Sequence, residues 1–272
     1  MDKTLAKGMA VLEYLVDQAR PCGVSDVARA LDLAASNAHR TLQSLVALGY
    51  VRQLPDARYG ATLRLFEMGT RVAAGLDVKE VARQELAGLA QQTEETIHLA
   101  VRDGAEVIYL DKIDSPQPVA AYSRVGGRAP AQCVATGKVL LAQALPQREQ
   151  AETWLAGTIP VLHPHTPSSH RSYSSLLEDL LQARAQGHAL NREEWREGVC
   201  GLGAPIFDGR ATAIAALGMS LPSIRFTADR VPMLAELLRA AAARASAALG
   251  YGPAAVMALG RAGNGATPIL NH

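Results

Sequence analysis

The side chains best suited to recognising a ligand lie close together between positions 36 and 44. They are hydrogen-bonding groups with one fixed positive charge, namely Ser36, Asn37, His39, Arg40, Thr41, Gln43 and Ser44. Asn, Gln and Arg can make paired hydrogen bonds to the edges of DNA bases, whereas Ser, Thr and His can reach bases or phosphates. This composition favours base recognition, although the solvated face of an ordinary helical hairpin has the same composition.

A predicted helix would bring these side chains to one face. Its opposite face is apolar, with Ala38, Leu42, Leu45 and either Val46 or Leu48. A shorter helix precedes it, marked by the spacing of Val24, Val27, Ala28 and Leu31. Asp32 breaks this first pattern and tolerates a left-handed turn, and Ser36 is a good N-cap for the second helix. The pattern predicts a helix-turn-helix over about residues 24–43, with the second helix as the recognition helix.

The residues after this helix pair predict a small β-ribbon. Gly49 and Tyr50 end the helix, and residues 50–54 and 58–63 have the composition of short strands joined by a turn at Pro55. Arg58 lies on the ribbon, where a phosphate backbone would pass. We therefore predict a winged helix-turn-helix domain over residues 1–62.

The rest of the chain predicts an α+β fold. We expect a first helix over residues 4–19 capped by Thr4, and a linker helix over 63–77 that packs on a partner. A second domain over residues 78–250 would hold one antiparallel sheet flanked by helices. Its predicted strands are residues 96–103, 105–113, 119–125, 201–208 and 212–221, and its predicted helices are 77–95, 138–145, 146–157, 173–187 and 228–249. The tail, residues 251–272, has a composition typical of disorder.

Charge and cysteine usage limit the possible partners. The net charge is +1, and residues 1–62 hold seven Lys or Arg against six Asp or Glu, so DNA affinity must come from local placement and from doubled contacts in an oligomer. Cys22, Cys133 and Cys200 have no CxxC spacing, which argues against a zinc ribbon or a disulfide framework. Without a signal peptide or an apolar run of about 18 residues, we expect a soluble cytoplasmic protein with no membrane partner.

Enzymes are the rival class. Cys133 or Cys200 with His98 or His188 would make a nucleophile and base, but neither cysteine has a base adjacent in sequence. We expect no catalysis.

Two further clusters have a simpler interpretation. Three histidines between positions 163 and 170 resemble metal ligands but lie in a Pro- and Ser-rich loop: His163, His165 and His170. Glu193, Glu194 and Glu197 resemble paired carboxylates but are expected to cap or solvate a turn. We expect no metal and no cofactor.

Four stretches resemble the IclR family of bacterial transcription regulators. SNAHRTLQSLVALGYV resembles the family's recognition helix, and YGATLRLFEMG resembles the end of its wing and its linker helix. CVATGKVLLA, residues 133–142, resembles the effector-loop motif, and residues 187–208 resemble the effector-domain signature. Their order and spacing together are highly specific.

The resemblance implies a GAF-like effector domain and dimers that read a near-palindromic operator in double-stranded DNA, often paired into tetramers. The implied DNA face comprises Ser36, Asn37, His39, Arg40, Thr41, Gln43, Ser44 and Arg58. The implied effector pocket comprises Ala121, Cys133, Ala135, Thr136, Gly137, Asn191, Val199, Gly201, Gly218 and Ser220.

The sequence departs from the family pattern at several pocket positions. Gln132 stands where an aromatic residue or His is frequent, Asn191 where an acid is common, and Gly201 and Gly218 where larger residues occur. These differences remove a charge and enlarge the cavity, so the effector of a relative cannot be transferred.

We expect the effector to be a small organic or aromatic acid. Small residues lead into a helix at Gly137 and Lys138, and a helix N-terminus favours an anion. The alternative is that residues 129–137 are small only because two elements pack closely. The predicted function is a ligand-responsive DNA-binding regulator, and the alternative function is a small-molecule sensor that does not bind DNA.

Overall fold

The computed structural model describes residues 2–18, 20–74, 77–120 and 123–252. Within these ranges, only the backbone is described for residues 70–74 and 77. Ala121 and the predicted tail from residue 253 onward therefore lie outside the described residues. The chain divides into two compact units, Met1–Leu76 and Asp77–His272. Both contribute a candidate site, and each is described by itself.

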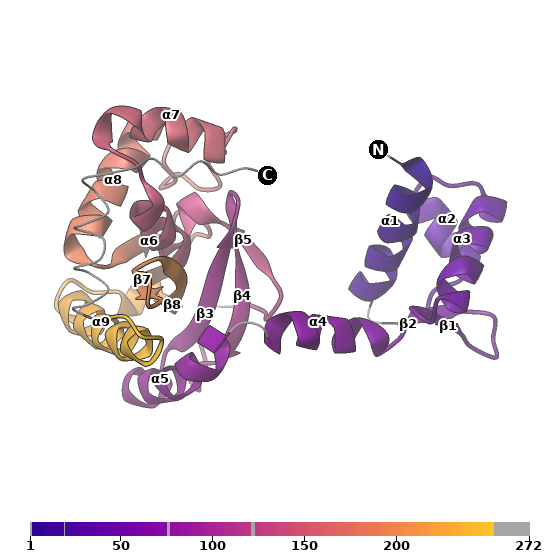
Figure 1. Cartoon of the computed structure of the whole chain (residues 1–272), viewed down its shortest axis with the longest axis horizontal. Helices are drawn as coiled ribbons and strands as arrows, with labels where there is room; N and C mark the ends of the chain where they lie inside the picture. The colour runs from indigo at the N-terminus through magenta and orange to yellow at the C-terminus, as the bar shows by residue number, and fades with distance from the viewer. Residues whose placement is uncertain (1, 19, 75–76, 121–122, 253–272) are drawn as a thin grey trace. The chain divides into compact units, whose positions relative to one another are not determined.

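The first unit is a winged helix. It contains α1 (Lys3–Asp17), α2 (Val24–Ala30), α3 (Ala35–Ala47), the paired strands β1 (Val51–Gln53) and β2 (Tyr59–Ala61), and α4 (Arg64–Ala74) (Figure 1). The predicted apolar faces form its core, in which Val27, Leu42 and Leu45 are buried with Tyr59 of the wing. The backbone of Tyr59 also pairs with Cys22, which ties the wing to the segment before α2.

Two predicted helix caps are wrong. Asp2, not Thr4, caps α1, because its carboxylate accepts the backbone N–H of Thr4 at 2.8 Å. Ser36 lies inside α3, whose N-cap is Ala34 without a side-chain hydrogen bond. The corner before α3 is as predicted, since Asp32 has a φ of 50°.

The second unit is built on a six-stranded antiparallel sheet in the order β5-β4-β3-β8-β7-β6. Its strands are β3 (Thr96–Asp103), β4 (Glu106–Ile113), β5 (Arg128–Pro130), β6 (Ala189–Arg192), β7 (Val199–Phe207) and β8 (Ala213–Pro222). Helices α5 (Asp77–Thr93) and α9 (Arg230–Ala248) pack together on one face. The other face carries α6 (Ala135–Ala144), α8 (Tyr173–Gln186) and α7 (Arg148–Thr158) (Figure 1). The predicted α+β class is correct.

The sheet departs from the prediction at its edges. The described residues of the predicted strand 119–125 are not strand. The backbone bonds to that of β4 at Gly126 and Gly127, which pair with Tyr109, and then along β5. Strand β6 was not predicted. Helix α6 begins at Ala135, so Gly137 and Lys138 lie within its first turn and do not precede the helix.

Candidate functional site

Helix α3 presents the predicted polar face to the surface. Ala38, Leu42 and Leu45 are buried on its other face. Ser36, His39, Arg40, Gln43 and Ser44 are exposed, and Asn37 and Thr41 are half-buried. All seven residues therefore lie on the side of the helix that a groove of DNA could approach.

Several of these side chains already have partners on the protein. The hydroxyls of Thr41 and Ser44 donate to the carbonyls of Asn37 and Arg40, one turn earlier, at 2.9 and 3.0 Å. The guanidinium of Arg40 donates to the amide oxygen of Asn37 at 3.0 Å. Hydroxyls bonded to their own helix are not directed at bases. Base contact is therefore more accessible to the first half of the face, at Ser36, Asn37, His39 and Arg40, than to Thr41 and Ser44.

Gln43 connects α3 to the wing. Its amide nitrogen donates to the hydroxyl of Tyr59 at 2.9 Å and lies 3.4 Å from the side-chain oxygen of Gln53. Tyr59 is only 1% exposed, so this bond holds one end of Gln43 against a fixed part of the fold. The sequence pattern gave no sign of this contact, because the two residues lie 16 positions apart.

The wing arginine is paired within the wing. Nε of Arg58 donates to Asp56 at 2.7 Å, and a second guanidinium nitrogen lies 2.6 Å from the same carboxylate oxygen. The hydrogen bonds from Arg58 lower the pKa of Asp56. Both side chains are about half exposed, so a phosphate could reach the guanidinium.

The second unit contains a cavity of about 400 Å³ on the side of the sheet covered by α6. Asn191, Gly201 and Ser220 are neighbours across β6, β7 and β8, and all three line it. Ala135 and Thr136 contribute the first turn of α6, and Val199 stands at the start of β7. Six of the ten predicted pocket residues therefore line one cavity.

Three other predicted residues lie near the cavity without lining it. Cys133 is buried in the turn before α6. A Cβ on Gly137 would lie 2.3 Å from the carbonyl oxygen of Ala131, so this glycine is needed for close packing. A Cβ on Gly218 would lie 2.3 Å from Nε2 of His98 and 2.5 Å from Cγ2 of Thr136. Gly218 therefore makes room for two residues that do line the cavity, while Ala121 lies outside the described residues.

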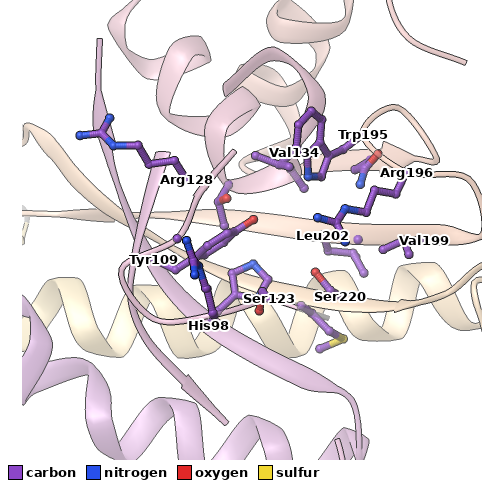
Figure 2. Close-up of a pocket in the computed structure, with 17 residues that line it drawn as sticks. His98, Tyr109, Ser123, Arg128, Val134, Trp195, Arg196, Val199, Leu202 and Ser220 are labelled. Carbon is purple, nitrogen blue, oxygen red and sulfur yellow. The ribbon is translucent and has the colours of Figure 1, made fainter. Parts of the chain in front are cut away.

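The cavity also has walls that the sequence prediction missed. His98 on β3 and Tyr109 on β4 lie edge to face with ring centroids 4.8 Å apart. The further missed lining residues are Ser123, Arg124, Gly127, Arg128, Val134, Trp195, Arg196, Leu202 and Met219. Figure 2 shows His98, Tyr109 and Ser123 on one side and Trp195, Arg196 and Val199 on the other. Strand β3 is buried on both faces, so its sequence does not alternate between apolar and polar residues along its whole length. The sequence pattern therefore could not show that His98 faces the cavity.

The electrostatics of the cavity favour an anion. Arg124 and Arg196 line it, whereas Arg128 is occupied by Asp103 and Glu106 at 2.7 and 3.0 Å. Burial, reinforced by the charge of Lys112, lowers the pKa of His98 to about 4, and burial raises the pKa of Tyr109 to about 12. Both rings are therefore neutral near pH 7. Among the described lining residues there is no carboxylate.

A buried ion network lies beside this cavity. The ammonium of Lys138, on α6, is 2.6 Å from Asp179 and 2.7 Å from Glu194. Nε2 of His170 is 3.1 Å from the same oxygen of Asp179. The main chain of Glu194 in turn donates to the side-chain oxygen of Asn191 at 2.9 Å. The network thus joins α6 to the segment that carries Trp195 and Arg196.

The three histidines that resemble metal ligands in the sequence are separated in the structure. The three predicted histidines do not form one group, since His165 packs on Trp195 while His170 bonds to Ser175 and Asp179. His170, Asp179 and Glu194 do lie within metal-binding distance of one another, but the ammonium of Lys138 already compensates both carboxylates.

The cysteines and glutamates do not form a reactive pair either. Burial raises the pKa of Cys133 to about 12 and also raises the pKa of Cys200, which is the reverse of an activated thiolate. Of the three glutamates, Glu194 is buried against Lys138, whereas Glu193 accepts the N–H of Gly198 at 3.0 Å in a turn.

Comparison with known families decides the identity. The model of the IclR helix-turn-helix domain matches residues 4–55, and the model of the C-terminal domain of the bacterial transcriptional regulator IclR matches residues 70–247. The chain belongs to the IclR family. The regulator KdgR of Escherichia coli K12 is 34% identical over 91% of this chain and 93% of its own length. The repressor AllR of the same organism is 31% identical over 91% and 90%.

Solved structures of IclR-family proteins have the same architecture. The IclR protein of Thermotoga maritima is 29% identical with a TM-score of 0.77, covering 92% of this chain and 100% of the other. An IclR homologue of Microbacterium hydrocarbonoxydans, solved with 4-hydroxybenzoate, is 26% identical with a TM-score of 0.77, covering 91% and 99%. The chain is thus a helix-turn-helix transcriptional regulator with a C-terminal effector domain. No described helix is both long and apolar enough to cross a bilayer.

Proposed function

We propose that α3 reads the operator through Ser36, Asn37, His39 and Arg40, while a small organic anion in the effector cavity controls operator affinity. The observation that carries the DNA assignment is the exposed polar face of α3 opposite a fully apolar one. Arg and Asn can each make bidentate contacts with a base, and the 3.0 Å bond between Arg40 and Asn37 keeps the two side chains together before DNA arrives.

The remaining residues of the predicted DNA face have supporting roles in this proposal. Thr41 and Ser44 are engaged with their own helix, and Gln43 fixes the wing against α3. Arg58 exchanges Asp56 for a phosphate when DNA binds. Sequence discrimination would then reside mainly in the first half of α3.

An anionic effector is supported by the charges around the cavity. Arg124 and Arg196 lie in its wall, and Figure 2 shows the side chain of Arg196 extending toward Tyr109. Ala135 and Thr136 bring the N-terminal turn of α6 to the same space, where unpaired backbone N–H groups attract negative charge. The homologue solved with 4-hydroxybenzoate also carries an organic acid.

A second copy of the chain is part of the proposal. Leu5, Met9 and Val16 share one face of α1 by their spacing and are 66%, 49% and 56% exposed, and Phe66 on α4 is 70% exposed. Burying these side chains in a dimer would remove them from water and double the DNA contacts of a nearly neutral domain. An effector that binds two dimer arrangements differently would shift operator affinity, and pairing of effector domains would give a tetramer.

Arg40→Ala tests the recognition helix. Operator affinity is measured by fluorescence anisotropy with a duplex selected from a random pool, and a scrambled duplex measures non-specific binding. We expect Arg40→Ala to weaken operator binding by about tenfold or more, because one bidentate base contact contributes about 1–3 kcal/mol. Arg148→Ala, which alters an exposed arginine of the effector domain, is the control. Operator binding unchanged by Arg40→Ala would refute the assignment.

Arg196→Gln tests the anionic effector. A thermal-shift screen of small organic acids identifies binders, since a ligand that prefers the folded state raises the melting temperature. Arg196→Gln should bind the carboxylates found in the screen about tenfold more weakly than the parent does, and its operator binding in the absence of ligand should be unchanged. Equal affinity of the variant and the parent for every acid would exclude Arg196 as the counter-ion.

A further inference from the structure

Unpartnered polar atoms in the effector cavity carry information about its ligand beyond charge. Nδ1 of His98, Oγ of Ser123 and Oγ1 of Thr136 are buried and have no hydrogen-bond partner among the residues that the structure describes, and all three residues line the cavity. Buried polar atoms in folded proteins nearly always have a partner, and exceptions mark places where a ligand or water supplies it. A flat apolar ligand would leave all three unpaired.

The chemistry of these groups suits hydroxyls. Serine and threonine hydroxyls donate and accept, and a neutral imidazole has one nitrogen of each kind. His98 is enclosed by Tyr109, whose ring lies 4.8 Å away, and by Gly218, beside which no Cβ would fit. A carboxylate can only accept hydrogen bonds, so it would satisfy these groups less completely than hydroxyls, which do both.

The positive and neutral groups are distributed along the cavity. His98, Tyr109 and Ser123 lie on one side, and Arg196 lies on the other beside Trp195 (Figure 2). Ser220 and Asn191 add further polar groups from the sheet, where each is a cross-strand neighbour of Gly201. The cavity is therefore suited to a ligand that carries a negative charge and also both donates and accepts hydrogen bonds. Its volume, about 400 Å³, is in the range of small-molecule sites.

We propose that the effector is a polyhydroxylated carboxylate of the sugar-acid class, whose hydroxyls pair with His98, Ser123 and Thr136. This inference rests on the proposed anionic effector and narrows it. The carboxylate lies toward Arg196, and the hydroxylated carbons lie between His98 on β3 and Thr136 in the first turn of α6.

Four probes separate charge from hydroxylation in the full-length protein. D-gluconate has both features, hexanoate and benzoate have only the charge, and sorbitol has only the hydroxyls. Because Trp195 lines the cavity, its fluorescence reports occupancy directly, and calorimetry gives the affinity. We expect gluconate to bind about tenfold or more tightly than hexanoate and benzoate, and sorbitol to bind far more weakly than gluconate.

Thr136→Val removes one hydroxyl while keeping the shape of the side chain. The variant should bind gluconate about tenfold more weakly than the parent does, and its affinities for hexanoate and benzoate should stay within about twofold of those of the parent. Thr212→Val, in an exposed turn outside this cavity, is the matched control. Ser123→Ala provides an independent variant if Thr136→Val folds poorly, and the melting temperature without ligand checks both.

The outcomes distinguish this inference from the broader proposal. If hexanoate or benzoate binds as tightly as gluconate, or if Thr136→Val and Ser123→Ala weaken all carboxylates alike, the sugar-acid inference is wrong and the anionic effector stands. If none of the three carboxylates binds, the anionic proposal fails and the sugar-acid class fails with it.

Discussion

The ammonium of Lys138 lies 2.7 Å from a carboxylate oxygen of Glu194, although the two side chains are only 1% and 9% exposed. A buried charge pair of this kind stabilises the fold only when both members are present. Here the pair also fixes the start of α6 relative to the segment that carries Trp195 and Arg196. Two walls of the cavity thus depend on one ion pair.

Lys138→Met should lower the free energy of unfolding of the effector domain by about 3–5 kcal/mol, because it leaves the buried Glu194 without its ammonium partner and leaves Asp179, which is 28% exposed, with His170 alone. Both tryptophans, Trp154 and Trp195, belong to this domain, so their fluorescence during urea unfolding isolates its transition. Arg148→Met breaks the exposed pair with Glu178 and should change the free energy by less than about 1 kcal/mol. Similar losses in the two variants would contradict the role of the buried pair.

His98 should make the effector domain less stable as the pH falls from 6.5 to 4. Its pKa is lowered from 6.5 to about 4, so over this range the unfolded chain takes up a proton that the folded chain does not. The corresponding loss is on the order of 3 kcal/mol. His98→Gln should remove this part of the pH dependence, as measured by urea unfolding at several pH values. His163→Gln changes an exposed histidine and is the control, so its free energy of unfolding should depend on pH as in the parent. If His98→Gln keeps the pH dependence of the parent, His98 is not a neutral buried histidine in the folded chain.

Asp179 should affect the stability of the effector domain at lower pH than His98 does. Burial by itself would raise the pKa of its carboxyl, but the hydrogen bonds and charges of His170 and Lys138 outweigh burial and lower the pKa to about 2. The stability that it contributes is present above pH 3.8 and is lost as the pH falls toward 2. Asp179→Asn should therefore flatten the acid limb below pH 4, and unfolding curves between pH 4 and 2 will measure it. An unchanged acid limb would show that the carboxyl is not paired in solution.

Gly218→Ala should destabilise the effector domain by about 1–3 kcal/mol, because the new methyl group would overlap His98 and Thr136. It should also weaken ligand binding, since both neighbours line the cavity. Gly157→Ala is the matched control, because a Cβ at this exposed helical position meets no atom within 4 Å. That variant should be neutral or slightly stabilising. Equal melting temperatures for the two variants would mean that the sheet yields easily at Gly218.

Asp56→Ala should strengthen binding to any DNA duplex several-fold. The change frees Arg58 from its 2.6 Å partner and removes a negative charge from the wing. Anisotropy with operator and scrambled duplexes at several salt concentrations will show a steeper salt dependence for both. Glu178→Ala removes an acid from the effector domain and serves as the control. Reduced affinity would mean that Asp56 positions Arg58 for phosphate.

The helix-turn-helix could be predicted because its determinants are local. The apolar spacing of α2 and α3 and the left-handed turn at Asp32 lie within some 25 residues of sequence. The N-cap was missed because α3 begins at Ala35 without a side-chain cap, so the good capping residue Ser36 falls one position too late. Propensity alone does not fix a helix end that packing already holds.

The cavity was only partly predictable because its walls come together from distant segments. The motif residues Ala135, Thr136, Asn191 and Ser220 were found by resemblance. His98 lies on β3 and Tyr109 on β4, and the faces that these side chains occupy are set by the register of β3 with β4 and β8, which the sequence does not reveal. The contact between Lys138 and Glu194 spans 56 positions, and a lone lysine in an apolar helix gives no sign of its partner.

The junction between α3 and α4 has a mechanical consequence. Arg64, the first residue of α4, donates to the carbonyl of Leu48 at 2.5 Å and stacks over Tyr50 at 4.7 Å, while the hydroxyl of Thr62 holds the carbonyl of Gly49 at 2.7 Å. These contacts attach the start of α4 to the segment that follows α3. A movement of α4 would therefore be transmitted to α3, the helix proposed to read the operator, and replacing Thr62 with glycine, which removes one of the three contacts, should weaken this coupling.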